Sequence, residues 1–316
     1  MAVSEAKPST VRAWGLLLVI VATAAWSTAG VWVKIVMAES GISVIYLAFW
    51  RDFITFLLLL SGMMLLNRAG LRVRARDLRW LALMGAIGIG LFHVLWNLSV
   101  QYNGASIATV LQYNAPIIVA VSARMLWGES LTWRKLTAIA LAFSGTLLIA
   151  LPGATGIHIT LTGLIIGLAS AAAISVYSLV GRRLTGAYPL WTIMTYIFGF
   201  GALAVLPLAV LTGDAWTLTP AAVGAFLSFV GIPTLGGFGF YTAGLKRLPA
   251  SVAAIVATTE VPLAGIVAFF ALGERLSGVQ WAGVFLVMFG VVLVSAPARW
   301  FIFLQRPGAA SRSLLR

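Results

Sequence analysis

Four ionisable side chains interrupt long apolar stretches of this sequence. Arg51 and Asp52 stand midway in one stretch, His93 in the next and Glu260 in a later one. On insertion scales a charge at the centre of a bilayer costs about 2.5–3.5 kcal/mol, so such groups must face protein or water. Glu260, Asp52 and His93 are therefore candidates for proton coupling, and Glu260 is also a candidate contact for an ammonium group. A structural pairing of Glu260 with Arg51 or Asp52 is the alternative, and Arg51 could instead hold a carboxylate.

Uncharged polar and aromatic side chains lie in the same stretches. His93 and Asn97 are four residues apart, so they share one face of a helix. Aromatic rings with polar edges suit a small molecule that has an apolar or aromatic part. The alternative for each is packing or an interhelical hydrogen bond. The residues predicted to contact a ligand are Trp26, Ser27, His93, Trp96, Asn97, Tyr113, Asn114, Tyr177 and Glu260.

Two prolines occupy the middle of apolar stretches. Pro116 and Pro262 each remove a backbone hydrogen bond and open a kink in a helix. Carbonyls freed near the centre of a bilayer can face a cavity or permit bending. We predict that both prolines act as hinges; a static kink is the alternative.

The composition requires a membrane for most of this chain. Of its 316 residues, 61% are hydrophobic and only 9% are charged, whereas a soluble domain carries about 25% charged residues. The formal net charge of +13 would suggest nucleic acid in a soluble protein. Here the basic residues stand in short loops, where they act as topology signals, so we expect no nucleic-acid partner.

The apolar runs predict an all-α integral membrane protein with ten transmembrane helices. Each run approaches the roughly 20 residues that a spanning helix needs. The predicted helices are Ala13–Val36, Ser43–Leu66, Leu78–Gln101, Ala105–Met125, Leu136–Leu151, Thr162–Leu184, Pro189–Thr212, Ala221–Leu245, Ala250–Leu272 and Ser277–Ala296.

The loops predict the orientation of these helices. Eighteen basic residues lie at the termini and in one set of alternate loops, and only Lys34 and Arg275 lie in the other set. Basic residues favour the cytoplasmic side of short loops. We therefore expect both termini in the cytoplasm, which an even number of helices permits.

The chain also repeats itself. Residues 105–152 align without a gap to residues 250–297, and the matches include Gly128 with Gly273 and Gly145 with Gly290. With five helices in each copy, the two copies cross the membrane in opposite directions. We therefore predict two inverted five-helix repeats related by a pseudo-twofold axis. The expected segments are a cytoplasmic N-terminus (1–12), a first repeat (13–151), a linker (152–161), a second repeat (162–296) and a basic cytoplasmic tail (297–316).

These features together resemble the drug/metabolite transporter superfamily, in particular its ten-helix EamA-like branch. The resemblance rests on Ala105–Ala108 and Ala250–Ala253, on the proline that follows each, and on Gly128-Glu129 and Gly273-Glu274. Trp26-Ser27-Thr28 and Tyr113-Asn114-Ala115-Pro116 are similar to stretches of bacterial aromatic amino-acid exporters. The resemblance implies export of amino acids or related metabolites through a central cavity.

We therefore predict a secondary transporter of the bacterial inner membrane that works by alternating access on a small-molecule substrate. The sequence contains no phosphate-binding loop or hydrolase motif, and its two histidines cannot build a usual zinc site, so we expect no cofactor, no metal and no enzymatic activity. Efflux of cationic drugs is the alternative within transport. A channel or an intramembrane enzyme is a further alternative. The oligomeric state stays open.

Overall fold

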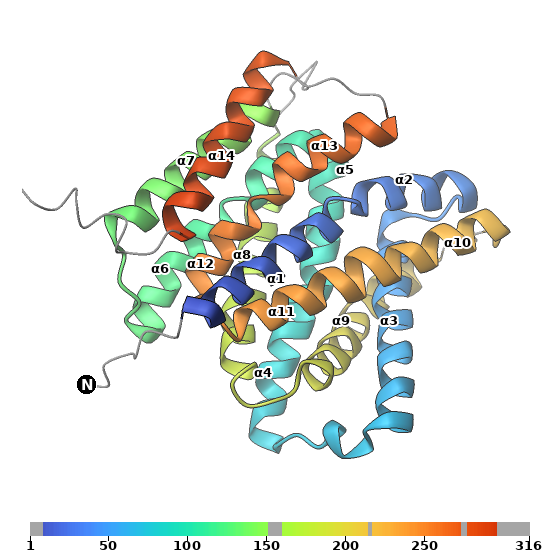
Figure 1. The fold of residues 1–316 in the computed structure, drawn as a ribbon. Helices are drawn as coiled ribbons and strands as arrows, with labels where there is room; N and C mark the ends of the chain where they lie inside the picture. Colours follow the sequence, from blue (N-terminus) through green and yellow to red (C-terminus); the bar gives the residue numbers. More distant parts are fainter. Residues whose placement is uncertain (1–8, 151–159, 214–216, 273–276, 296–316) are drawn as a thin grey trace, which may run out of the picture.

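A computed structural model describes residues 9–150, 160–213, 217–272 and 277–295 of the chain (Figure 1). The expected linker 152–161 lies outside the described residues except for its last two positions, and the expected tail 297–316 lies outside them entirely. The described part is helical and contains no strand, which confirms the prediction of an all-α protein.

The helices follow one another with short connections. In chain order they are α1 (Ser9–Trp26), α2 (Ala29–Ser40), α3 (Val44–Leu66), the 3-10 helix η1 (Arg68–Leu71), α4 (Ala75–Gly85), the π-helix η2 (Ala86–Leu91), α5 (Phe92–Gln112), α6 (Ala115–Trp127), α7 (Trp133–Ala150), α8 (Leu161–Leu184), α9 (Leu190–Thr212), α10 (Pro220–Phe229), the π-helix η4 (Val230–Phe238), α11 (Gly239–Leu245), α12 (Ala250–Ala257), α13 (Glu260–Leu272) and α14 (Gly278–Ser295).

Several of these elements join into apolar stretches of membrane length. In the described part of the chain, seven stretches are long and apolar enough to cross a bilayer, and Ala115–Trp127 and Ala250–Ala264 are shorter apolar helices. Large apolar side chains such as Leu66, Leu211 and Phe285 are exposed on the outer surface. A soluble protein would bury such residues, so lipid is the solvent of this surface.

The predicted boundary between the third and fourth helices, at residues 102–104, lies inside α5, so the structure does not confirm ten separate helices. Three of the predicted continuous helices are interrupted. The first breaks at Ser27 and Thr28, the fourth at Tyr113 and Asn114, and the ninth at Thr258 and Thr259. Side chains at each break bind the backbone carbonyls that the missing helical turn frees: Thr28 bonds to Ala25, Asn114 to Leu111, and Thr258 to Ile255. These bonds make a broken backbone tolerable inside a membrane.

The two prolines lie directly after two of these breaks. Pro116 lies in the first turn of α6 and Pro262 in the first turns of α13, each just after a break. A proline costs little there, because the first N–H groups of a helix have no partner within the helix. The prolines therefore begin the second half of a discontinuous helix, rather than kinking a continuous one.

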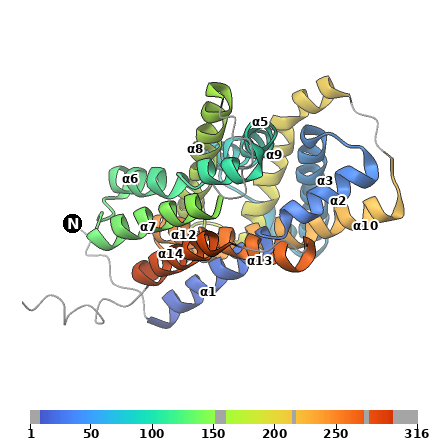
Figure 2. The ribbon, with the colours of Figure 1, turned by 90° about the horizontal axis from the view of Figure 1, so that it is seen from above.

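Helices α7 and α14 cross in direct backbone contact and lie side by side in both views (Figures 1 and 2). A Cβ atom added to Gly145 would lie 2.5 Å from the carbonyl oxygen of Gly283, and one added to Gly290 would lie 2.9 Å from that of Ala138. Position 138 thus faces 290 while 145 faces 283, so the two helices run antiparallel.

Candidate functional site

A cavity lies where the three helix breaks meet. Its volume is about 110 Å³, and its lining comes from both sequence halves. Helices α1, α2, α3, α5, α6, α8, α11, α12 and α13 and the π-helix η4 contribute to it. The lining residues are Trp26, Ala29, Arg51, Phe92, His93, Trp96, Gln112, Tyr113, Ala115, Pro116, Ile174, Ser178, Pro233, Thr234, Phe238, Tyr241, Ala254, Ala257 and Glu260.

Arg51, Asp52 and His93 form a buried charged cluster on one wall. Asp52 is fully buried, and its carboxylate lies 3.5 Å from Nε of Arg51 and 3.1 Å from Nδ1 of His93. The guanidinium of Arg51 also lies over the ring of Phe229, at 5.0 Å from its centroid. Asp52 does not line the cavity itself, so it holds Arg51 and His93, which do.

Three nitrogen atoms of this cluster, Nε and Nη2 of Arg51 and Nε2 of His93, are buried without a hydrogen-bond partner among the described residues. Among the described residues, nothing accepts a hydrogen bond from Nη2 of Arg51 or contacts Nε2 of His93 at hydrogen-bond distance. Buried polar groups are normally paired, because an unpaired one loses its hydration without compensation. Both side chains line the cavity, so a polar group in the cavity could satisfy them.

Glu260 lies at the first position of α13 and accepts a hydrogen bond from the hydroxyl group of Tyr113, at 2.7 Å. Both side chains line the cavity. The structural alternative for Glu260, a pairing with Arg51 or Asp52, is not seen: Asp52 contacts Arg51 and His93 instead. Tyr113 lies in the break between α5 and α6, and Glu260 starts α13 directly after the break at Thr258 and Thr259, so the hydrogen bond joins two breaks.

Aromatic rings form most of the remaining wall. Trp26 packs against Phe238 and Tyr241 with ring centroids 5.1 Å apart in both pairs, and His93 lies 5.7 Å from Phe238. A Cβ atom added to Gly237 would lie 2.4 Å from the indole nitrogen of Trp26. Only glycine at that position therefore lets the indole lie flat against η4.

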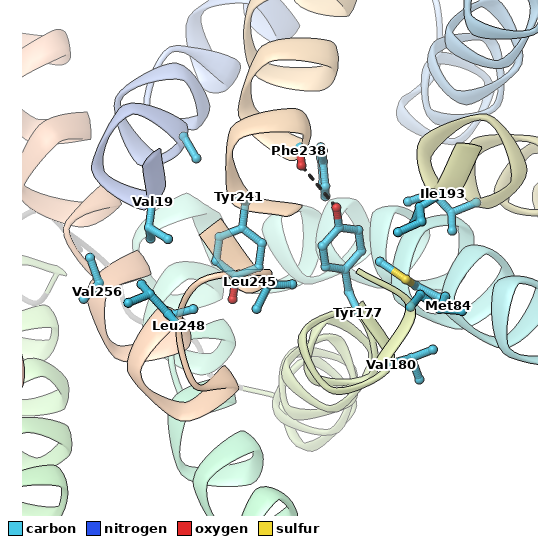
Figure 3. Packing of buried hydrophobic residues seen from close by; sticks show 14 of the residues in the cluster. Val19, Met84, Tyr177, Val180, Ile193, Phe238, Tyr241, Leu245, Leu248 and Val256 are labelled. Carbon is cyan, nitrogen blue, oxygen red and sulfur yellow. Dashed lines mark hydrogen bonds between the residues drawn. The ribbon is translucent and has the colours of Figure 1, made fainter. Parts of the chain in front are cut away.

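Tightly packed side chains separate the cavity from the loop at residues 246–249. Tyr241 lines the cavity and receives or donates a hydrogen bond with Ser178 at 2.8 Å. One turn further along α11, Leu245 is buried together with Leu248 and Val19 (Figure 3). The cavity is therefore closed on the side of this loop.

The structure gathers five of the nine predicted ligand-binding residues around the cavity: Trp26, His93, Trp96, Tyr113 and Glu260. The other four lie outside its lining. Ser27 bonds to the carbonyl of Ala24, and Asn114 to that of Leu111. Asn97 donates to the carbonyl of Val44 at the start of α3, and Tyr177 is fully buried against Phe238 and Thr242.

Sequence reasoning missed part of the lining. Arg51 was weighed as a carboxylate ligand but not counted with the site, and Phe92, Thr234 and Phe238 were not singled out. For Arg51 a signal existed, because an arginine in the middle of an apolar run is rare. A phenylalanine in an apolar run has no such signal, since most of them pack against protein or lipid.

A metal centre has no support in the described residues. Within residues 9–150, 160–213, 217–272 and 277–295, no group of three His, Cys, Asp or Glu side chains comes close enough to hold an ion. The cavity thus offers charged groups, hydrogen bonds and aromatic surface for a ligand.

Comparison with known proteins gives a consistent result. The chain is 26% identical to the uncharacterized inner membrane transporter YicL of Salmonella typhimurium, over 90% of this chain and 96% of that one. It is 31% identical to a probable terminal-alkyne amino-acid exporter of Streptantibioticus cattleyicolor, over 71% of this chain and 75% of that one. A crystal structure of a protein 19% identical superposes with a TM-score of 0.76, over 91% of this chain and 98% of that chain, and shows the same fold.

The model of the EamA-like transporter family matches residues 13–151 and again residues 161–296. A membrane transporter of this kind works on a small molecule and is surrounded by lipid. The chain belongs to the EamA-like transporter family.

Proposed function

We propose that this chain exports amino acids with neutral, apolar or aromatic side chains across the bacterial inner membrane by alternating access. The observation that carries the proposal is the cavity in which Arg51 and Glu260 face the same space among aromatic rings. An amino acid carries a carboxylate, an ammonium group and a side chain, and this lining offers a partner for each. The name of the relative from Streptantibioticus cattleyicolor supports the same substrate class.

We propose two inverted repeats of five helices. The α7–α14 contacts support them, because an offset of 145 residues converts 138 into 283 and 145 into 290, and so turns each contact into the other. The breaks at 113–114 and 258–259 also differ by 145, and the π-helices η2 and η4 fall in matching places. Such equivalent pairs are expected of halves related by a pseudo-twofold axis.

The proposed repeats also give the chain an orientation in the membrane. We place the termini and the basic loops in the cytoplasm, following the distribution of Lys and Arg. Contacts between loops support one common side: Tyr188 donates to Asp77, and Arg182 donates to the carbonyl of Leu248. The cavity is closed toward these loops, so we assign the conformation to a state that excludes the cytoplasm.

The mechanism we propose moves the halves about the helix breaks, with Pro116 and Pro262 at the hinges. A break with side-chain-capped carbonyls can change its angle without breaking helical hydrogen bonds. His93, Asp52 and Glu260 remain the candidates for coupling to protons, and facilitated diffusion is the alternative.

Efflux of organic cations is the second candidate function, because Glu260 and the rings of Trp26 and Tyr241 would suit a cation. Arg51 in the same lining disfavours it, since a cationic substrate would meet a like charge. A channel would differ from either carrier by showing single-channel currents.

The test is counterflow in liposomes. The purified chain is reconstituted into liposomes that contain one unlabelled amino acid. The same amino acid in labelled form is then added outside. We expect accumulation of label for apolar or aromatic amino acids and none for a polyamine or quaternary ammonium cation. Accumulation of the cations alone would contradict the proposal in favour of cation efflux.

A further inference from the structure

We infer that the cavity recognises a zwitterion, with Arg51 holding the carboxylate of the substrate and Glu260 holding its ammonium group. The inference rests on the proposed function and specifies how the site selects its substrate. Arg51 belongs to the first half of the chain and Glu260 to the second. One substrate molecule would therefore connect both halves of the transporter.

Arg51 has donors left for an anion after its protein contacts are made. Asp52 lies at the Nε edge of the guanidinium, at 3.5 Å, and the ring of Phe229 covers one face. The terminal atom Nη2 is buried and has no hydrogen-bond partner in the described part of the chain. A guanidinium has five N–H donors in a planar fork, so a second carboxylate can bind at its free end.

Glu260 likewise has an acceptor left for a cation. Oε2 accepts the hydroxyl of Tyr113 at 2.7 Å, and no described residue donates to Oε1. The Tyr113 hydroxyl fixes the carboxylate at the N-terminus of α13, and Glu260 is partly exposed and lines the cavity. An ammonium group of the substrate can approach Oε1 without displacing Tyr113.

Arg51 and Glu260 do not neutralise each other, although both line one cavity. Asp52 already balances the charge of Arg51, but Nη2 of Arg51 and Oε1 of Glu260 have no partner among the described residues, and buried polar groups of this kind are expected to be satisfied by a ligand. A single charge on a ligand would satisfy one of them only. A molecule with a carboxylate and an ammonium group satisfies both at once, which favours the zwitterion over a simple cation or anion.

The experiment uses the amino acid that gives the strongest counterflow, together with two analogues of it. The amide analogue lacks the carboxylate charge, and the des-amino analogue lacks the ammonium group. For the unaltered protein we expect each analogue to compete at least about tenfold more weakly than the parent, as expected for a lost hydrogen bond to a charged group.

Each variant is expected to lose the preference for the parent amino acid over one of the two analogues. R51Q/D52N removes both members of the ion pair. In this variant we expect the apparent affinity for the parent amino acid to fall about tenfold or more, while the apparent affinity for the amide changes less than about threefold. In E260Q we expect a similar fall in the apparent affinity for the parent amino acid and little change in that for the des-amino analogue. R68Q and E39Q, which change exposed charges away from the cavity, serve as matched controls.

The outcomes separate the inference from the proposed function. Amino-acid counterflow in which both variants weaken the parent and its analogues equally would overturn the zwitterion site and leave the transport function intact. Absence of amino-acid counterflow in the unaltered protein would overturn the proposed function and the zwitterion site with it. If R51Q/D52N does not fold, E260Q alone decides, because its effect on the des-amino analogue is predicted independently.

Discussion

At the scale of single residues, Asp52 does most to organise the site. It is fully buried and contacts both Arg51 and His93, but it does not line the cavity. Its charge makes a guanidinium tolerable at that depth, since a buried cation without a counter-ion is strongly unfavourable. Asp52 therefore positions two lining residues instead of contacting a substrate.

This arrangement predicts a compensating pair of substitutions. D52N leaves the guanidinium of Arg51 without its counter-ion, and we expect it to lower the free energy of unfolding by about 3–5 kcal/mol. R51Q/D52N removes both charges and should recover most of that loss. Thermal unfolding in detergent, followed by the fluorescence of the 12 tryptophans, measures both. A double variant less stable than D52N would contradict the ion-pair interpretation.

At the scale of elements, the fold depends on close approaches at a few glycines. Gly145 and Gly290 bring the backbones of α7 and α14 together, and Gly90 does the same for η2 against Gly201 of α9. Small residues are the usual means of packing helices in lipid, where apolar side chains gain little by leaving the solvent. The helix pairs therefore depend on shape at these positions more than on hydrophobicity.

The glycine contacts give a prediction with an internal control. G145A places a methyl group 2.5 Å from a backbone oxygen that cannot move away alone. We expect a loss of about 1–3 kcal/mol in the free energy of unfolding, and a smaller loss for G290A, whose nearest oxygen lies at 2.9 Å. G224A meets nothing within 4 Å and should be neutral or slightly stabilising. Equal effects of all three would contradict the close packing.

Glu129 connects elements of both halves. It follows Gly128, whose φ of 66° ends α6, and its carboxylate accepts the hydroxyl of Ser251 at 2.6 Å. Lys135 lies at 3.2 Å and Arg182 at 3.6 Å from the same carboxylate. One side chain thus holds α7, α8 and α12 together at the end of the cavity that is closed.

Neutralising this carboxylate should loosen that end. We expect E129Q to reduce the free energy of unfolding by about 1–2 kcal/mol, because its partners are partly buried and keep only a neutral acceptor. E39Q, an exposed carboxylate on α2, should change it by less than about 0.5 kcal/mol. The comparison uses the same thermal unfolding measurement. If E39Q lowered the free energy of unfolding as much as E129Q, the proposed role of Glu129 in joining the helices would be contradicted.

At the scale of the whole molecule, the proposal that the two halves cross the membrane in opposite directions can be tested by labelling. The chain has no cysteine, so single cysteines can be introduced without background. Ala69 in η1 and Ala187 in the loop after α8 are exposed close to the basic residues Arg68 and Arg183. Glu39 and Leu218 are exposed at the other end, where Thr217 bonds to Ser40.

Topology predicts a clear division among these positions. Cysteines at Ala69 and Ala187 should react with an impermeant maleimide only after cells are lysed, because the proposed orientation places them in the cytoplasm. Cysteines at Glu39 and Leu218 should react in spheroplasts that are intact. Labelling of Ala69 and Leu218 on one side would refute the proposed orientation and the inverted halves together.

Much of the architecture could be predicted from the sequence because composition acts over long stretches. Too few charges and continuous apolar runs require a helical membrane protein. The gapless repeat indicates two related halves, and a charge in an apolar run, such as Glu260 or His93, must face an interior. These inferences need no knowledge of which helices touch.

Only the tertiary structure decided which side chains meet. Sequence spacing did not reveal that Glu260 bonds to Tyr113 while Asp52 bonds to His93, since those partners lie in helices far apart along the chain. The sequence predicts proline kinks at Pro116 and Pro262 and no break in the first helix, because the capping of the Ala25, Leu111 and Ile255 carbonyls depends on local geometry. The apolar pattern sets how many helices cross the membrane, but side-chain shape and hydrogen bonding between neighbouring helices set what the cavity contains.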